Sequence, residues 1–269
     1  MLEQIEINEI IAIAQRAGDA IMEIYRKDFD IEYKDDKSPL TQADKKAHVI
    51  IVEALNALHI THHSSPLPIL SEEGSEIPYE LRKDWDYFWM VDPLDGTKEF
   101  IQKNDEFTVN IALISGGEPI LGVVYAPAIG EMYYAKKGEG AYKMLLEGGE
   151  WSAAKKLPIP RSDDRLVVVA SKSHLSKETQ LFIDKLQNSS LMTHRSSLEC
   201  ISKGSSLKLC MVAEGSADIY PRLAPTMEWD TAASCVIVRE AGKMTYHTDE
   251  STPLSYNKES LLNPWFIVK

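Results

Sequence analysis

Apolar residues recur at helical spacing in two stretches near the start of the chain. The first stretch contains Ile10, Ala14, Ala17, Ile21 and Ile24. This spacing places the apolar side chains on one side of a helix, so we predict an amphipathic helix over about residues 4–27. The same pattern predicts a second helix over residues 43–58. The link between the two helices is polar and contains Pro39.

The next part of the chain contains short apolar runs of the kind that form strands. They cover residues 67–70, 87–92, 107–114, 120–127 and 131–137. The Gly116-Gly117 pair between two of these runs is typical of a turn between neighbouring strands. We therefore predict that the first half of the chain packs helices on a largely antiparallel sheet.

The second half alternates predicted strands and helices. Residues 165–170 form a continuous apolar run, which is typical of a strand buried on both faces. Helices are expected over 176–186, 206–215 and 229–242, and further strands over 217–221 and 265–268. This alternation predicts an α/β arrangement with a mixed, mostly parallel sheet. The proline- and charge-rich stretch 157–164 is a candidate boundary, so we expect one domain over residues 1–269 with subdomains 1–157 and 158–269.

The balance of charges disfavours nucleic-acid polymers as partners. The chain has 29 Lys and Arg against 41 Asp and Glu, a net charge of −12, and such a protein repels a polyanion. A small anionic substrate stays compatible with this charge if metal ions or a few placed cations offset the repulsion. Cys200, Cys210 and Cys235 have no CxxC spacing, so we expect buried thiols and neither a disulfide framework nor a zinc site.

Membrane and export signals are not evident in the sequence. No apolar run approaches the ~18 residues that a membrane-spanning helix needs. The N-terminal sequence MLEQIEINEI is acidic and lacks the basic and apolar regions of a signal peptide. We therefore expect a cytoplasmic protein without an integral membrane segment, and peripheral association with the inner membrane stays open.

The segment WMVDPLDGTKEF (residues 89–100) carries the clearest chemical signal. An apolar strand runs into Asp92, and Asp95 follows three residues later, after a proline turn. Two carboxylates separated by such a turn can converge on one point, and the Leu94 carbonyl can add a third oxygen. Hard divalent cations such as Mg²⁺ prefer oxygen ligands of this kind.

The residues that follow are suited to hold a phosphate. The amides of Gly96 and Thr97 open a predicted helical turn, where backbone N–H groups can bind a phosphate oxygen. The alternative is an ordinary Asp-Pro turn in which Asp95 only caps that turn. The segment alone does not decide between the two.

Other acids lie at the ends of apolar elements. Glu72 and Glu73 follow a predicted strand, and because neighbouring residues of a strand point to opposite faces, at most one of them should reach a given metal. Asp44 and Asp230 each lie near the start of a predicted helix, where a capping role is the alternative. Each acid has a simple structural explanation by itself, but the set of them together favours a metal site.

Several motifs together resemble a known superfamily. The sequence SEEG, then WMVDPLDGTKEF, then WDTAA resembles the inositol monophosphatase superfamily of metal-dependent, lithium-sensitive phosphatases. The segments TKEFIQKNDEFTVNIALI, SKSH, GSSLKLCMVAEGSADIYPR and PTMEWDTAA are similar to one branch, the bacterial 3'(2'),5'-bisphosphate nucleotidases. Inositol phosphatases typically read DPIDGTTNF and lack the SSLK and YPR elements. The resemblance covers nearly the whole chain.

The resemblance implies a fold and a cofactor. The fold is a layered αβαβα sandwich of the inositol monophosphatase/fructose-1,6-bisphosphatase type. The cofactor is Mg²⁺, two or three ions. The implied metal ligands are Glu72, Asp92, the Leu94 carbonyl, Asp95 and Asp230, with the first glutamate of SEEG as the direct ligand.

The resemblance also implies catalytic and substrate-binding roles. Asp44 would help hold a weaker metal ion and orient the attacking water, with Thr97 and Glu72 assisting that water. The residues implied in substrate binding are Gly96 and Thr97 at the scissile phosphate, His174, Ser205 and Lys208 at the nucleotide, Arg222 near the 5'-phosphate, and Asp230.

The implied reaction removes the 3'-phosphate of adenosine 3',5'-bisphosphate (PAP) to give AMP and phosphate, with the sulfated nucleotide PAPS as a second candidate substrate. In relatives this activity clears a by-product of sulfate assimilation. One alternative is an inositol monophosphatase or a broad sugar-phosphate phosphatase. Another is a nucleotide or metal sensor that binds without turnover. The expected partner is thus a small bisphosphate nucleotide, and we expect a monomer.

Overall fold

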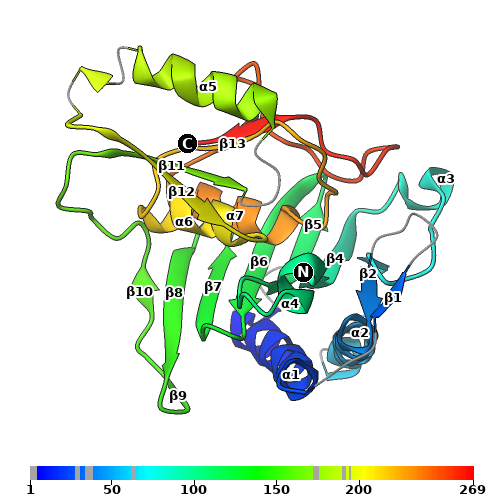
Figure 1. Ribbon diagram of the computed structural model, residues 1–269. Helices are drawn as coiled ribbons and strands as arrows, with labels where there is room; N and C mark the ends of the chain where they lie inside the picture. The colour runs from blue at the N-terminus through cyan, green and yellow to red at the C-terminus, as the bar shows by residue number, and fades with distance from the viewer. Residues whose placement is uncertain are drawn as a thin grey trace.

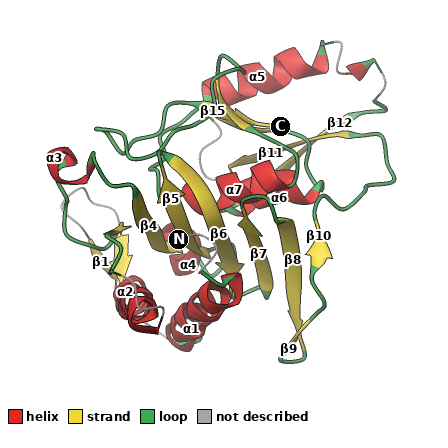
Figure 2. Ribbon diagram, turned by 180° about the vertical axis from the view of Figure 1, so that it is seen from behind, coloured by secondary structure: helices red, strands yellow, loops and turns green. Residues whose placement is uncertain are grey.

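The structure, a computed structural model, describes residues 5–27, 31–33, 39–61, 65–171, 176–189, 192–193 and 195–269. Its elements form five layers (Figure 1). Helices α1 and α2 cover one face of a large sheet, and α6 and α7 cover the other face. Beyond α6 and α7 lie the strands of the second half, with α5 outermost (Figure 2). The predicted αβαβα sandwich is confirmed.

The elements have the following bounds in chain order. They are α1 (Ile7–Tyr25), β1 (Ile31–Tyr33), β2 (Pro39–Thr41), α2 (Gln42–Thr61), β3 (Ile69–Ser71), α3 (Tyr79–Arg82), β4 (Tyr87–Asp95), α4 (Thr97–Ile101), β5 (Thr108–Ser115), β6 (Glu118–Ala126), β7 (Glu131–Lys136), β8 (Gly140–Glu147), β9 (Glu150–Trp151), β10 (Lys155–Lys156), β11 (Leu166–Ser171), α5 (Lys177–Gln187), β12 (Leu198–Lys203), α6 (Leu207–Glu214), β13 (Tyr220–Arg222), α7 (Ala232–Glu240), β14 (Thr245–His247) and β15 (Phe266–Val268).

The large sheet has the strand order β10-β8-β7-β6-β5-β4-β3, with β9 paired to β8. Its neighbouring strands are antiparallel except for β3 and β4, which run parallel. The prediction of a largely antiparallel sheet in the first half is therefore confirmed. Strand β8 was not predicted and is the longest strand without a counterpart among the predicted ones.

Both faces of this sheet are buried, which explains why its strands read as apolar runs. In β5, Val109 and Ile111 pack in the core shared with α1 and α2, whereas Ala112 and Ile114 pack in the core shared with α6 and α7. Gly122 of β6 allows α7 to approach closely, because a Cβ there would lie 2.3 Å from the Ala233 carbonyl oxygen. The sheet is thus a central layer covered on both faces.

The second half combines parallel and antiparallel pairing. Strands β11 and β12 are parallel, and β13, β15 and β14 form an antiparallel sheet in that order. The mixed sheet was predicted, but within the described part of the second half parallel pairing is confined to β11 with β12 and a single bridge from Val168 to Ile219. The reason is that the chain reaches β15 through an irregular segment and not through the helical crossover that parallel neighbours need.

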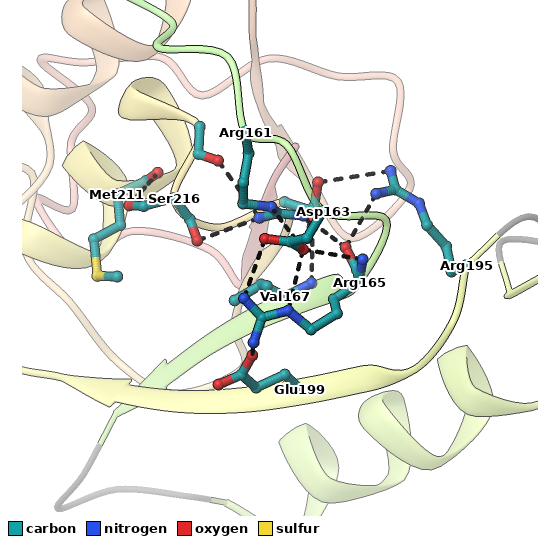
Figure 3. A network of polar contacts seen from close by, with 10 residues as sticks. Arg161, Asp163, Arg165, Val167, Arg195, Glu199, Met211 and Ser216 are labelled. Carbon is teal, nitrogen blue, oxygen red and sulfur yellow. Dashed lines mark hydrogen bonds and ion pairs between the residues drawn. The ribbon is translucent and has the colours of Figure 1, made fainter.

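The predicted boundary segment is tied to the second half by a polar network (Figure 3). Arg161 bonds the carboxylate of Asp218 at 2.8 Å, and the same Asp218 oxygen accepts from the Val167 N–H at 2.7 Å. Arg165 pairs with Asp163 at 3.1 Å. These contacts fix the start of β11 against the segment before β13. The division into subdomains 1–157 and 158–269 stays a prediction.

Two further expectations can be compared with the structure. Cys210 and Cys235 are buried, as predicted, but Cys200 is exposed. Cys200 lies on β12 on the same face as Ser202, two residues further on, and both side chains are exposed there. None of the helices within the described residues is long and apolar enough to cross a membrane.

Candidate active site

The end of β4 places two aspartates close to each other without a regular strand between them. Asp92 and Asp95 both pair with β5, and the register shifts between them. The Asp92 carboxylate accepts from the Leu94 N–H at 3.1 Å, which closes the turn around Pro93. Gly96 follows with a φ of +93°, a conformation that glycine adopts readily, and α4 begins at the next residue.

Three acids from separate parts of the chain converge at this point. Carboxylate oxygens of Glu72, Asp92 and Asp230 all lie within 4.8 Å of one another. Glu72 follows β3, and its N–H continues the β3–β4 pairing by donating to the Val91 carbonyl at 3.1 Å. Asp230 comes from the turn before α7. Glu73, the neighbour of Glu72, is not in this group, in agreement with the expectation that only one of the two would point to it.

The clustered charges strongly perturb these groups. Burial raises the pKa of Asp92 well above its ordinary value, and the charges of Glu72 and Asp95 raise it further. The pKa of Asp230 is also raised, first by burial and then by the Asp95 charge. A buried set of mutually repelling carboxylates is unfavourable by itself, but it offers the all-oxygen donor set that hard divalent cations require. The residues present therefore fit a divalent metal.

Asp95 is held by the start of α6. One of its carboxylate oxygens accepts from the Ser206 N–H at 2.6 Å and from the Ser206 hydroxyl at 2.7 Å. Asp95 is not the N-cap of α4, since that position is Gly96, and the Asp95 carboxylate bonds the start of α6 instead. Asp230 does not cap α7 either: its carboxylate accepts from the Met227 N–H at 3.0 Å.

Asp44 combines a structural bond with a contact to the site. One carboxylate oxygen accepts from the Thr41 N–H at 2.7 Å and from the Thr41 hydroxyl at 2.6 Å, as in a cap at the start of α2. The other oxygen accepts from the Thr97 hydroxyl at 3.2 Å. Thr97 also lies 3.4 Å from the Leu94 carbonyl oxygen. Burial raises the pKa of Asp44.

A cavity of about 280 Å³ opens beside the acids. The predicted site residues that line it are Glu72, Asp95, Gly96, Thr97, Ser205, Lys208, Arg222 and Asp230. Gly96 and Ser205 approach closely there, because a Cβ on Gly96 would lie 3.3 Å from the Ser205 Cβ. The starts of α4 and α6 thus form one wall of the cavity.

Three cationic residues line the same cavity, Lys98, Lys208 and Arg222, and the last two are predicted nucleotide contacts. Lys208 is buried, its Nζ donates to the Ser205 carbonyl at 2.6 Å, and burial lowers its pKa to about 8. Arg222 donates to the Pro225 carbonyl at 2.6 Å, while its Nε is buried with no hydrogen-bond partner among the residues that the structure describes. His174, the third predicted nucleotide contact, lies outside the described residues.

Buried polar residues around the site escaped the sequence analysis. Asn110 and Ser206 are almost fully buried and bond each other at 2.8 Å beside Asp95. Asparagine is unusual inside an apolar strand, so its place in the run over residues 107–114 was a signal that could have been used. Glu228, fully buried, holds the N–H groups of Asn257 and Lys258 at 2.6 and 3.1 Å, which braces the turn that carries Asp230.

Comparison with known proteins identifies the family. The family model described as "Inositol monophosphatase family" matches residues 3–265. The chain belongs to the inositol monophosphatase family. Membership of this family implies use of a divalent metal, and the cluster of Glu72, Asp92 and Asp230 is a place where the chain could bind it.

Individual relatives are similar to this chain over most of their length. The chain is 43% identical to the 3'(2'),5'-bisphosphate nucleotidase CysQ of Escherichia coli strain K12 over 265 residues, which covers 97% of this chain and 98% of the relative. It is 35% identical to the protein of the same name from Haemophilus influenzae, covering 97% and 91%.

A solved structure with a similar fold is that of CysQ from Bacteroides thetaiotaomicron. It has a TM-score of 0.84 and 46% identity and covers 98% of this chain and 96% of its own. The extragenic suppressor protein suhB of Bartonella henselae has a TM-score of 0.70 and 27% identity, covering 97% and 92%. The match therefore spans the whole layered fold.

Proposed function

We propose that this protein is a Mg²⁺-dependent 3'(2'),5'-bisphosphate nucleotidase that hydrolyses the 3'-phosphate of PAP to AMP and phosphate. The observation that carries the proposal is the presence of Lys208 and Arg222 in the same cavity as the acidic cluster. A substrate with one phosphate needs only the acids and their metal ions. The charges of Lys208 and Arg222 on the cavity wall favour a substrate with a second phosphate.

The metal ligands in this proposal are Glu72, Asp92, Asp95, Asp230 and the Leu94 carbonyl, with two or three Mg²⁺ ions. Bound Mg²⁺ supplies Lewis-acid polarisation of the phosphate and lowers the pKa of a bound water. In the hydrolysis, the water oxygen forms a bond to phosphorus while the bond from phosphorus to the 3'-oxygen breaks. The proton that the water loses balances the one that the 3'-oxygen gains.

The chain's own residues orient the water and the phosphate. Thr97 donates its hydroxyl proton to Asp44, so its oxygen lone pairs stay available to accept from a water in the cavity. The backbone N–H groups of Gly96 and Thr97 open α4 toward the cavity and can bind the scissile phosphate. Asp44 is fixed by Thr41, which keeps the water-orienting pair in one arrangement.

The second phosphate lies beside the start of α6 and Arg222 in this proposal. Lys208 donates to it from a buried position, and Arg222 assists near the 5'-phosphate, with Ser205 beside them. His174 keeps its predicted role at the nucleotide. We include PAPS as a second substrate and a monomeric protein in the proposal, and the cytoplasmic location stays a prediction.

Product identification tests this assignment. Purified protein is incubated with PAP and Mg²⁺, and the nucleotides are separated by chromatography. We expect AMP, with the 5'-phosphate retained, and no product after chelation of the metal. Adenosine 3'-phosphate as the main product would contradict the placement of the two phosphates, and no product under any condition would favour the sensor alternative.

A further inference from the structure

Ser206 bonds three separate parts of the site through one buried side chain. Its exposed fraction is 2%. Its hydroxyl lies 2.7 Å from an Asp95 carboxylate oxygen and 2.7 Å from the Asp230 carbonyl oxygen. The amide Nδ2 of Asn110 donates to the same hydroxyl at 2.8 Å. The end of β4, the middle of β5 and the turn before α7 therefore meet at this residue.

A hydroxyl group has one proton to donate and an oxygen that can accept, and this determines whether Ser206 is the donor or the acceptor in each of these bonds. Asn110 is oriented by Thr108, whose hydroxyl donates to the Asn110 Oδ1 at 3.1 Å, so the amide nitrogen faces Ser206. Because the Asn110 nitrogen is a donor, the Ser206 oxygen accepts from it, and the single Ser206 proton is donated to its other neighbours. Both remaining neighbours, the Asp95 carboxylate and the Asp230 carbonyl, are acceptors.

Ordinary helix capping does not explain this serine. Ser206 is the N-cap of α6, a position where a serine side chain usually accepts from a backbone N–H of the first turn. Here the side chain makes no such bond. Its carbonyl accepts from the N–H groups of Leu209 and Cys210, while the hydroxyl points to the acids. The side chain thus serves the site and not its own helix.

We propose that Ser206, oriented by Asn110, is a positioning residue that presets Asp95 and the Asp230 turn for metal binding. The Ser206 N–H donates to one Asp95 oxygen, and the single hydroxyl proton is shared between that oxygen and the Asp230 carbonyl. These bonds fix the rotation of the Asp95 carboxylate and leave its second oxygen for a metal ion. The bond to the Asp230 carbonyl holds the turn of a second predicted ligand. This inference rests on the proposed metal site, but it does not depend on which phosphate ester is hydrolysed.

The test measures Mn²⁺ affinity without substrate, from the signal of free Mn²⁺ in electron paramagnetic resonance. Loss of an outer-shell partner typically weakens metal affinity by ~10–100-fold, so we expect an effect of about that size for Ser206→Ala. Asn110→Ala should weaken affinity less, because it disorients the Ser206 hydroxyl without removing it, whereas Ser206→Ala removes the hydroxyl and keeps only the backbone N–H. The double variant should resemble Ser206→Ala alone, since both changes act through one hydroxyl.

Ser234→Ala is the matched control. Ser234 is equally buried, and its hydroxyl donates to a backbone carbonyl, that of Thr231, at 3.0 Å. This variant should lose some thermal stability and keep the wild-type Mn²⁺ affinity. If Ser206→Ala does not fold, Asn110→Ala and its conservative partner Asn110→Ser carry the test.

The outcomes separate this inference from the proposed function. Wild-type Mn²⁺ affinity in Ser206→Ala would overturn the positioning role. If that variant does not fold, wild-type Mn²⁺ affinity in both Asn110 variants would overturn it. An equal loss of Mn²⁺ affinity in Ser234→Ala would also overturn it. A wild-type protein that binds no Mn²⁺ would overturn both the role and the metal site. If the Ser206 and Asn110 variants bind Mn²⁺ more weakly, Ser234→Ala does not, and the wild type does not hydrolyse PAP, the positioning role is supported and only the nucleotidase assignment is contradicted.

Discussion

Lys208 gives the sharpest prediction, because its charge should be unfavourable for folding and favourable for substrate binding. The side chain is buried, its Nζ has the Ser205 carbonyl at 2.6 Å, and the Tyr220 ring lies 5.7 Å away. Lys208→Met keeps a similar length and removes the charge. We expect this variant to be more stable than the wild type in the absence of metal and substrate, and to be a poorer enzyme toward PAP.

The magnitude follows from the pKa. Burial lowers the pKa of Lys208 from 10.5 to about 8, and a difference of this size corresponds to about 3 kcal/mol against folding at neutral pH. Loss of the bond to Ser205 offsets about 1 kcal/mol of this. The variant should therefore gain about 2 kcal/mol in the free energy of unfolding at pH 7.

The sign of the pH dependence follows from the same numbers. Between pH 8 and 10.5 the unfolded chain keeps the Lys208 proton that the folded protein has released. Because the unfolded state then binds more protons, wild-type stability rises with pH across this window. The advantage of Lys208→Met should accordingly shrink between pH 8 and 10.5.

The assay combines denaturation in a chelator at pH 7 and pH 9 with initial rates on PAP and on inositol 1-phosphate. A hydrogen bond to a charged group contributes about 1.5–3 kcal/mol, so kcat/KM for PAP should fall by ~10–150-fold, while that for inositol 1-phosphate should hardly change. Lys185→Met, at an exposed position of α5, is the control and should change neither quantity. A Lys208→Met variant that is less stable than the wild type, or that keeps its PAP activity, would refute the reasoning.

Four other changes have definite expected results. Asp95→Asn should fold normally, as judged by circular dichroism, and its rate of phosphate release should fall by more than roughly 100-fold. The reason is that even outer-shell partners of a metal contribute about 10–100-fold to metal affinity or activity. Substantial activity of this variant would contradict the role of Asp95 as a ligand. Mg²⁺ at ~100 times its Kd should stabilise the wild type by about 2.7 kcal/mol in thermal melts, and no shift would argue against a metal site. Gly122→Ala should lower stability by about 1–3 kcal/mol in urea denaturation, since its Cβ would meet the Ala233 carbonyl at 2.3 Å. Arg82→Leu should lower stability by about 2–4 kcal/mol in the same assay, because buried Arg82 bonds Asn257 at 2.8 Å and two carbonyls; a near-neutral result would contradict that account.

Elements with strong periodicity could be predicted closely from the sequence, and elements that bury a charge could not. Helix α1 and strand β5 lie within a few residues of their predicted bounds because their apolar pattern is regular. Strand β8 was missed since Lys143 interrupts its pattern. That lysine is buried in the fold between Glu214 at 2.8 Å and Glu131 at 3.1 Å, a pairing that no local pattern reveals.

In the site, too, some residues could be predicted from the sequence and others could not. Acids at the ends of apolar elements were visible in the sequence, and Glu72, Asp92 and Asp230 do converge. The partners of these acids were not visible, because Ser206 reaches Asp95 across 111 positions of the chain. Only the three-dimensional arrangement shows which neighbouring polar residues hold the carboxylates in place.

The central claim is that this chain removes one phosphate from a bisphosphate nucleotide. The most direct measurement is phosphate release from PAP and from inositol 1-phosphate, side by side, with Mg²⁺ and then with added Li⁺. We predict a strong preference for PAP and loss of that activity in Li⁺. A preference for inositol 1-phosphate would contradict the substrate assignment while leaving the fold and the family intact. No phosphate release from either ester would contradict the claim that this chain is a phosphatase.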